Sequence, residues 1–447
     1  MNADSSWIRR WSWMQRNLAA ADPTGRPALQ RLLLGAAGIL SAQAAIQGSN
    51  LLVGLLILRQ LGVREYGIYV IAGTLIGVSA ILANMSLSAA MSFRVARAAE
   101  DPARLATIIS TASTLQYALI AFALLGVTAI GIAYRHQFDN RLELSAALII
   151  IYVHLILAAR LELARSVRFA LRHTRPVIMA DAAIAGLRLV VIVPVVLLAP
   201  WVGALPLLLA NAGAQVAGFV TLRMPHGSHL QADRREMRLL LRYMAPLWPE
   251  NLYYLIQGNV AVMVIAWVGG HSQVAELGAL TRLVQIVMIL AILNRFLVQP
   301  YVARYNSLRD FRHRSLQVLS VYAAGSMLLL LLVWLAPQPF LLVLGAQYQH
   351  LTGYVLPVMA FGVVSLGGGL VYWLCLSSGR TAGMSLTIPF GIIIQVSYIA
   401  LVGLETVGAA VGFMLATALV ELVVRLGILA WLSERPSPAV PRSVGID

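Results

Sequence analysis

Long apolar runs alternate with short polar stretches along almost the whole chain. A membrane-spanning helix needs about 20 consecutive, mostly apolar residues, and these runs are long enough to supply them. The fourth run is short and the eighth carries more polar residues than the others. The pattern predicts twelve membrane-spanning helices, near residues 33–58, 67–90, 107–133, 145–159, 177–199, 202–222, 243–268, 277–303, 317–335, 352–378, 384–403 and 406–432.

The connections between these predicted spans are too short to hold a soluble domain. Near the N-terminus, Trp7, Trp11 and Met14 recur at helical spacing, which favours an amphipathic helix lying on the membrane surface over a disordered tail. The domain organisation that we expect is a cytoplasmic interfacial segment at 1–32, a six-helix half at 33–222, a basic cytoplasmic linker at 223–242, a second six-helix half at 243–432 and a cytoplasmic tail at 433–447.

The composition agrees with a membrane protein. Hydrophobic residues make up 60% of the 447 residues and charged residues only 11%, with a mean hydropathy of +0.80. A soluble domain uses about 25% charged residues to cover its surface. Cys375 is the only cysteine, so an intrachain disulfide is excluded.

The basic residues orient the predicted helices in the membrane. All 33 are arginine, and the formal net charge is +15. With a cytoplasmic N-terminus, 25 arginines fall in cytoplasmic segments and 4 in outer loops. Cytoplasmic loops of membrane proteins carry this excess of positive charge. The distribution predicts that both termini are cytoplasmic, and it explains the basic balance by anchoring to anionic lipid, without nucleic acid as a partner.

A short internal echo suggests that the two halves are related. VREYG at 63–67 follows the first predicted span, and VAELG at 274–278 follows the seventh. Both lie just before an even-numbered span, with 211 residues between equivalent positions. Two such halves, related by an axis along the membrane normal, are typical of transporters with a central cavity.

Longer motifs carry a resemblance to a known family. They are LRQLGVREYGIY at 58–69, SLSAAMSFRVAR at 86–97, VGGHSQVAELGAL at 268–280, PFLLVLGAQYQ at 339–349, YWLCLSSGRTAG at 372–383 and VGAAVGFMLAT at 407–417. In this order and spacing they resemble the bacterial oligosaccharide-lipid flippases of the Wzx type, the polysaccharide-transport branch of the MOP exporter superfamily. Asn259 stands where many members have an acidic residue, so no role of that acid transfers to this chain.

The resemblance implies an all-α polytopic protein of the bacterial inner membrane. Its expected substrate is a polyprenyl-diphosphate-linked oligosaccharide, moved from the cytoplasmic to the outer leaflet by alternating access for exopolysaccharide, O-antigen or capsule synthesis. A polysaccharide polymerase and chain-length proteins are candidate partners. No catalysis, cofactor or metal is expected, and coupling to a proton or sodium gradient is left open.

Two other functions are compatible with parts of the sequence. A drug or cation antiporter of the same superfamily would share the twelve spans and two halves. A membrane glycan polymerase or ligase would be expected to carry a long outer loop with catalytic groups, but the predicted outer loops are short and nearly uncharged. No GxxxxGK[ST] motif occurs, which argues against ATP hydrolysis at a phosphate-binding loop of that type.

Charged residues inside predicted spans are candidates for transport, because each costs at least ~2.5 kcal/mol on insertion scales. We predict that Arg188 and Arg295 bind the lipid diphosphate, although Arg295 could instead extend to the cytoplasmic interface. Asp181 and Glu250 are candidates for lining the cavity or for coupling. Arg188 and Asp181 are about 10 Å apart along one helix, too far to pair with each other, so the alternative for each is a structural ion pair with another helix. The alternative for Glu250 is an interfacial position. Arg282 is expected near the outer interface.

Neutral amides are candidates for contacting sugar hydroxyls. They recur at helical spacing in the first and sixth predicted spans, and hydrogen bonding between helices is the other interpretation. Glu421 and Arg425 favour a local salt bridge four residues apart. His226 and His229 lack the acidic or cysteine neighbours of a zinc site. The predicted sugar contacts are Gln43, Gln47, Asn50, Asn211 and Gln215.

Overall fold

The computed structural model describes most of the chain between residues 45 and 434. Every described segment is helical or a short connection between helices. Residues 1–44 and 435–447, which include Gln43 and the predicted interfacial and tail segments, lie outside this part, as do Arg295, His226 and His229. The described residues are 45–98, 101–171, 173–198, 203–222, 232–268, 270–288, 290–291, 298, 302, 307–377 and 384–434.

The chain first crosses the fold as a helix that includes residues 45–60. The helices that follow are α3 (Val63–Asn84), α4 (Leu87–Arg97), α5 (Pro102–Ala133), α6 (Arg141–Ala170), α7 (Thr174–Leu198), α8 (Ala204–Thr221), α9 (Arg234–Met244), α10 (Trp248–Val268), α11 (His271–Met288), α14 (Leu308–Leu335), α15 (Gln338–Leu344), α16 (Thr352–Ser377), α17 (Thr387–Val402) and α18 (Val407–Glu434).

Eight helical stretches of the described residues are long and apolar enough to cross a membrane. They coincide with the second to sixth, ninth, tenth and twelfth predicted spans. The seventh and eighth predicted spans overlap α10 and α11, and the eleventh overlaps α17, a shorter apolar helix of 16 residues. The prediction of an all-α, multi-pass membrane protein is confirmed, whereas the side of the membrane that each end faces stays a prediction.

Two helices differ from their predicted spans. α6 has 30 residues and extends beyond both ends of the predicted segment at 145–159, because its arginines and glutamates end the apolar run without ending the helix. The second predicted span, at 67–90, is broken between α3 and α4. Met85 and Ser86 have φ angles of 39° and 69°, in the left-handed region that interrupts a right-handed helix.

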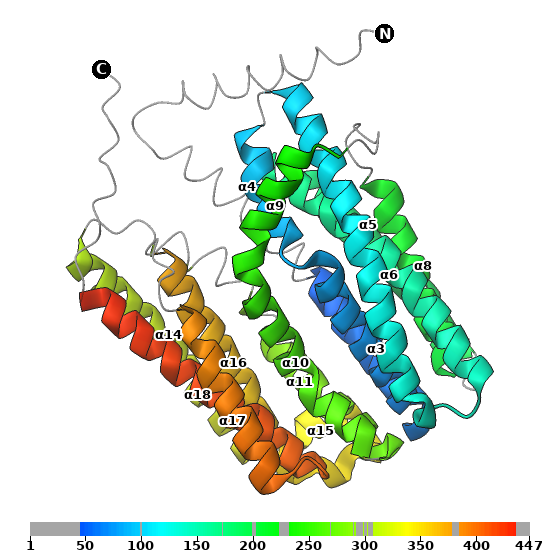
Figure 1. The fold of residues 1–447 in the computed structure, drawn as a ribbon. Coiled ribbons are helices and arrows are strands. Elements are labelled where there is room, and N and C mark those ends of the chain that lie inside the picture. Colours follow the sequence, from blue (N-terminus) through cyan, green and yellow to red (C-terminus); the bar gives the residue numbers. More distant parts are fainter. Residues whose placement is uncertain are drawn as a thin grey trace.

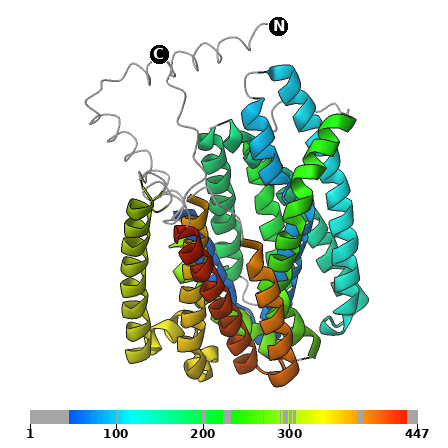
Figure 2. The same ribbon diagram turned by 60° about the vertical axis from the view of Figure 1, so that its left-hand side comes forward.

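The helices form two groups with α10 and α11 between them. Figure 1 shows α5, α6 and α8 together on one side and α14, α16, α17 and α18 on the other, and Figure 2 shows the same bundle turned. α11 packs against both α3 and α16, and α10 packs against both α3 and α18. The largest buried cluster therefore joins both groups, through residues such as Ile57, Tyr66, Leu280 and Met359.

The bundle has two distinguishable ends, which we call the α15 end and the α9 end (Figure 1). The α15 end collects the connections predicted to lie outside the cell. There, Arg59 donates hydrogen bonds to the carbonyls of Leu342 and Val343, the latter at 3.1 Å. In return, the Gln347 amide donates to the carbonyl of Leu58 at 3.0 Å.

At the α15 end, the charged residues of VREYG join α3 to the connection between α5 and α6 and to the start of α8. Arg64 pairs with Asp139 at 2.6 Å. Glu65 accepts a hydrogen bond of 2.7 Å from the backbone N–H of Ala204, the first residue of α8. A carboxylate at this position satisfies a free N–H and complements the positive end of the helix dipole.

The two copies of the internal echo lie in α3 and α11, which pack against each other. Gly67 packs so closely on α11 that a Cβ there would lie 2.8 Å from the carbonyl oxygen of His271. Gly278 of α11 packs equally closely on Val70 of α3. The glycines of VREYG and VAELG thus allow α3 and α11, one from each predicted half, to approach each other.

Candidate functional site

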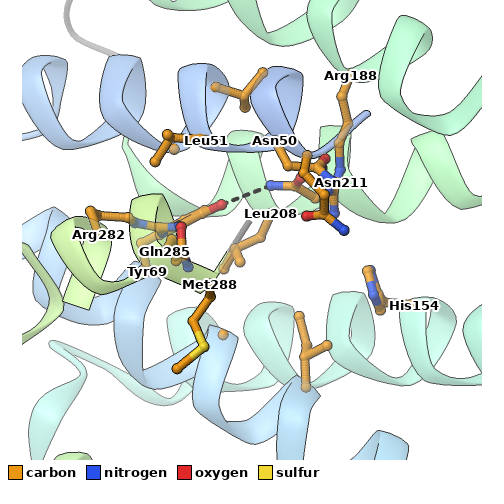
Figure 3. A pocket seen from close by; sticks show the side chains of 15 residues that line it. Asn50, Leu51, Tyr69, His154, Arg188, Leu208, Asn211, Arg282, Gln285 and Met288 are labelled. Carbon is orange, nitrogen blue, oxygen red and sulfur yellow. Dashed lines mark hydrogen bonds between the residues drawn. The ribbon is translucent and has the colours of Figure 1, made fainter. Parts of the chain in front are cut away.

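A polar cavity of about 530 Å³ lies where the helix of residues 45–60 meets α3, α6, α7, α8 and α11. Its polar side chains come from all of these helices, and Figure 3 shows several of them pointing into one space. We call it the arginine cavity. Its lining residues with polar side chains are Gln47, Asn50, Tyr69, His154, Arg188, Asn211, Arg282 and Gln285.

Arg188 reaches the arginine cavity from the middle of α7. Its guanidinium Nη1 donates a hydrogen bond of 2.9 Å to Oδ1 of Asn50. Its Nε is buried and has no hydrogen-bond partner among the described residues. A buried N–H without an acceptor is costly unless another group supplies that acceptor. This side chain is therefore suited to binding an anion that enters the cavity.

Arg282 brings a second guanidinium to the same cavity from α11. Its Nε donates to the Tyr66 hydroxyl at 3.2 Å, and its Nη1 donates to the Gln285 side chain at 3.1 Å. The guanidinium also lies against the backbone at Gly54. The predicted position of Arg282 toward the outer end agrees with its contact to Tyr66, but its side chain lines the cavity instead of only extending to the interface, because α11 turns this face toward the helix of residues 45–60.

The VREYG segment is connected to the cavity through two tyrosines. Tyr66 is fully buried and its ring stacks on that of Tyr69, with 6.2 Å between centroids. The Tyr69 hydroxyl accepts a hydrogen bond of 3.0 Å from the Asn211 amide, drawn as a dashed line in Figure 3. Because Tyr66 also holds Arg282, this segment positions groups on both sides of the cavity.

The electrostatic character of the arginine cavity is positive. Arg188 and Arg282 are its charged lining residues, and no Asp or Glu is among the lining residues that the structure describes. His154 of α6 also faces this space and is buried, and its Nδ1 lacks a hydrogen-bond partner among the described residues. Two cations without a carboxylate favour an anionic ligand over a cationic one.

A second cavity, of about 770 Å³, shares Gln47, Asn50 and Arg188 with the first. We call it the entry cavity. It is also lined by Arg165, Asp181 and Gln215, and by Trp373 of α16. Asp181 does not pair with Arg188: its carboxylate accepts a hydrogen bond from Nη2 of Arg165 on α6. Asp181 therefore both lines a cavity and forms an interhelical ion pair.

The predicted sugar contacts are divided between the two cavities. Gln47 and Asn50 line both, Asn211 lines the arginine cavity and Gln215 lines the entry cavity. Asn50 and Asn211 also form hydrogen bonds between helices. The amides thus line the cavities, two of them also join helices, and their contact with sugar stays a prediction.

Glu250, Glu421 and Arg425 belong to α10 and α18, and neither helix contributes to the described lining of the two cavities. Glu250 lies in the first turn of α10, just after the 3-10 turn Ala245–Leu247 that separates α10 from α9. Its side chain is outside the described part of the structure. Glu421 and Arg425 form the predicted salt bridge, at 3.7 Å, and the Tyr253 hydroxyl donates to Glu421 at 2.8 Å.

Four residues of the arginine cavity were not predicted from the sequence: Tyr69, His154, Arg282 and Gln285. Each belongs to a largely apolar helix whose inward face cannot be identified from one sequence. A signal was available for the last two, because Arg282 and Gln285 are three residues apart and therefore share one face of a helix.

Comparisons with known proteins identify the fold. No protein-family model matches the sequence, and no curated protein matches it. Among solved structures, an inward-facing multidrug resistance MATE family transporter of the MOP superfamily is similar, with a TM-score of 0.67 at 14% identity, over 90% of this chain and 100% of that one. An outward-facing structure of a transporter with the same description has a TM-score of 0.61 at 12% identity, over 89% and 94%.

A third similar structure is a MOP superfamily transporter from Pyrococcus furiosus, for which a binding pocket of reversed polarity is described as suggesting a different function. It has a TM-score of 0.57 at 12% identity, over 88% of this chain and 94% of that one. At such identities the likeness establishes the fold. The chain therefore has the fold of MOP superfamily transporters.

Proposed function

We propose that this protein is an inner-membrane flippase that moves a polyprenyl-diphosphate-linked oligosaccharide from the cytoplasmic to the outer leaflet. The observation that carries the proposal is the pairing of Arg188 and Arg282, from opposite predicted halves, in one cavity whose described lining contains no carboxylate. The diphosphate is the part of such a substrate that most needs compensation, because an unpaired charge in hydrocarbon is costly.

The remaining lining suits the other part of the headgroup. Gln47, Asn50, Asn211 and Gln285 offer amide donors and acceptors at the surface of the arginine cavity. Sugar hydroxyls both donate and accept hydrogen bonds, and amides can pair with them in either sense without fixing a charge. The polyprenyl tail would remain in the lipid while the headgroup crosses.

Alternating access requires that the two ends of the bundle open in turn. Hydrogen bonds from Arg59 and Gln347 join the helix of residues 45–60 to the α15 region. Tyr134 and Gln137, after α5, donate to the carbonyls of Met263 and Ala266 at the end of α10, both at 2.7 Å. These contacts support a state that is closed at the α15 end, and they would have to break for substrate to leave there.

The first test is translocation by the purified protein. It would be reconstituted into vesicles with a fluorescent polyprenyl-diphosphate disaccharide, and the fraction exposed to a membrane-impermeant quencher would be followed over time. We expect translocation by the wild type, and a loss of about tenfold or more in Arg188→Ala and Arg282→Ala, because each removes a half-buried cation that lines the cavity. Arg312→Ala is the matched control, since Arg312 is exposed and donates to the Ser433 carbonyl.

The fold also favours a second candidate, a drug or cation antiporter, because similar structures include a multidrug resistance transporter. The same vesicles distinguish the two. A cationic dye that exchanges across the membrane, with no movement of the lipid-linked sugar, would contradict the flippase proposal. We expect the reverse, because two arginines repel a cation in a cavity with few compensating charges.

A further inference from the structure

The ion pair between Arg165 and Asp181 lies beside the proposed substrate path, not within a packed core. Both residues line the entry cavity, which also reaches Arg188. Their side chains are 24% and 20% exposed. A purely structural pair between α6 and α7 would not need to face a cavity of this size. The pair is thus accessible to an anion that occupies the cavity.

Arg165 has more hydrogen-bonding capacity than its partners use. Its Nη2 donates to Asp181 and its Nη1 to Glu162, which lies 3.3 Å away and is more exposed. Its Nε is buried and has no hydrogen-bond partner among the described residues. The planar guanidinium has five N–H donors arranged to match a carboxylate or a phosphate. A carboxylate of this chain therefore occupies a site that a phosphate could also occupy.

The ion pair of Arg165 and Asp181 lies closer than Arg188 to one end of the bundle. Asp181 precedes Arg188 by seven residues on α7, which is two helical turns or about 10 Å along the axis. Asp181 is on the side of α7 nearer its first residue, and Arg165 is near the end of α6. An anion that enters through this part of the bundle meets Arg165 before Arg188.

We propose that Arg165 is an entry subsite for the diphosphate and that Asp181 occupies it in the empty protein. An arriving diphosphate displaces the Asp181 carboxylate from Arg165 and then passes to Arg188. Asp181 returns to Arg165 behind it, so that the cation left by the diphosphate is again neutralised. The inference rests on the proposed function, since it assigns that substrate a first contact.

Replacement of the Asp181 carboxylate by a diphosphate at Arg165 is favoured because the diphosphate carries more negative charge. A diphosphate diester is a dianion, and it can offer more acceptor oxygens to the guanidinium than the single Asp181 carboxylate. Charge-assisted, bidentate contacts of this kind are stronger than single hydrogen bonds. The Asp181 carboxylate lowers the affinity of the empty site without preventing binding.

Binding of inorganic diphosphate to the full-length protein in lipid nanodiscs tests the subsite without a lipid-linked sugar. In titration calorimetry, Asp181→Asn should bind inorganic diphosphate about tenfold more tightly than wild type, because Arg165 is no longer occupied. In an Arg165→Gln background, the same substitution should tighten binding by less than about twofold. There the carboxylate of Asp181 acts only on a diphosphate held at Arg188, about 10 Å away, and that repulsion is screened at physiological salt. Asp310→Asn is the control, because Asp310 pairs with Arg314 at 2.8 Å and lines neither cavity.

Two results would overturn the inference: an unchanged affinity in Asp181→Asn, or an equal gain with and without Arg165. If Asp181→Asn does not fold, Arg165→Gln carries the test through transport kinetics. It should raise KM for the lipid-linked sugar about tenfold with little change in kcat, whereas an unchanged KM contradicts an entry role.

The subsite and the proposed function can fail separately. Tighter diphosphate binding in Asp181→Asn, without movement of the lipid-linked sugar by wild type, would keep the anion subsite and reject the flippase. Movement of the lipid-linked sugar with unaltered diphosphate binding in Asp181→Asn would keep the flippase and reject the subsite.

Discussion

The guanidinium of Arg282 lies against Gly54, and a Cβ at position 54 would come within 2.8 Å of Nη1. An alanine at this position fits only if the end of the flexible Arg282 side chain shifts. Gly54→Ala should therefore move the guanidinium and reduce translocation of the lipid-linked sugar by about tenfold. The matched control is Gly48→Ala, six residues earlier in the same helix, where an added Cβ meets nothing within 4 Å. Equal loss of translocation in both variants would show that the helix, and not Arg282, is sensitive to the added methyl group.

The geometry of Arg188, and not only its charge, is expected to matter. Arg188→Lys keeps a cation but cannot donate to Asn50 and also present further donors in one plane. Its translocation rate should lie between those of wild type and Arg188→Ala. The measurement is the initial rate at equal amounts of reconstituted protein. A rate for Arg188→Lys equal to that of wild type would mean that a point charge is sufficient.

Glu65 should contribute to stability through the start of α8. Glu65→Gln removes the negative charge at the Ala204 N–H and the pair with Arg64 at 3.2 Å. We expect a loss of about 1 kcal/mol, seen as a decrease of roughly 1 °C in the Tm of the detergent-solubilised protein. Glu405→Gln, at an exposed position, is the control and should leave Tm unchanged. A similar decrease in Tm in both variants would contradict a stabilising role of the Glu65 carboxylate at the start of α8.

Arg59 should hold the α15 region closed. Arg59→Ala removes the hydrogen bonds to the carbonyls of Leu342 and Val343. Hydrogen exchange of the amides of α15 should then be faster by about tenfold, because local opening becomes less costly. Arg135→Ala, which changes an arginine at the same end, should leave this exchange unaltered. Unchanged exchange in Arg59→Ala would place the closure of this end in other contacts.

The sequence predicted the fold class well, because its main determinant is the length of apolar runs. Eight of the predicted spans coincide with apolar helices of sufficient length among the described residues. The extent of α6 was not predicted, since a helix can continue through Arg160 and Glu162 while the apolar pattern ends. The helix break at Met85 and Ser86 could not be predicted, because no glycine or proline lies at this position.

The site was predicted only in part, for a different physical reason. Arg188 and the amides could be found because polar residues are rare in apolar spans. The cavity that Arg282 lines depends on how α11 is rotated and on the space left at Gly54, which lies on another helix. The partner of Asp181 likewise depends on the packing of α6 against α7, and Arg165 lies 16 residues away in the sequence. Such contacts are tertiary and leave no periodic trace in one sequence.

Four of the hydrogen bonds that join helices at the α15 end share a property with an evolutionary consequence. Arg59, Tyr134, Gln137 and Gln347 all donate to backbone carbonyls, at Val343, Met263, Ala266 and Leu58 respectively. Every residue type presents a carbonyl. Substitutions at the accepting positions therefore keep the contact as long as the helix keeps its path. These four hydrogen bonds therefore constrain the side chains of the donors and not those of the acceptors, among which Leu58 and Ala266 are constrained by their burial in the core instead.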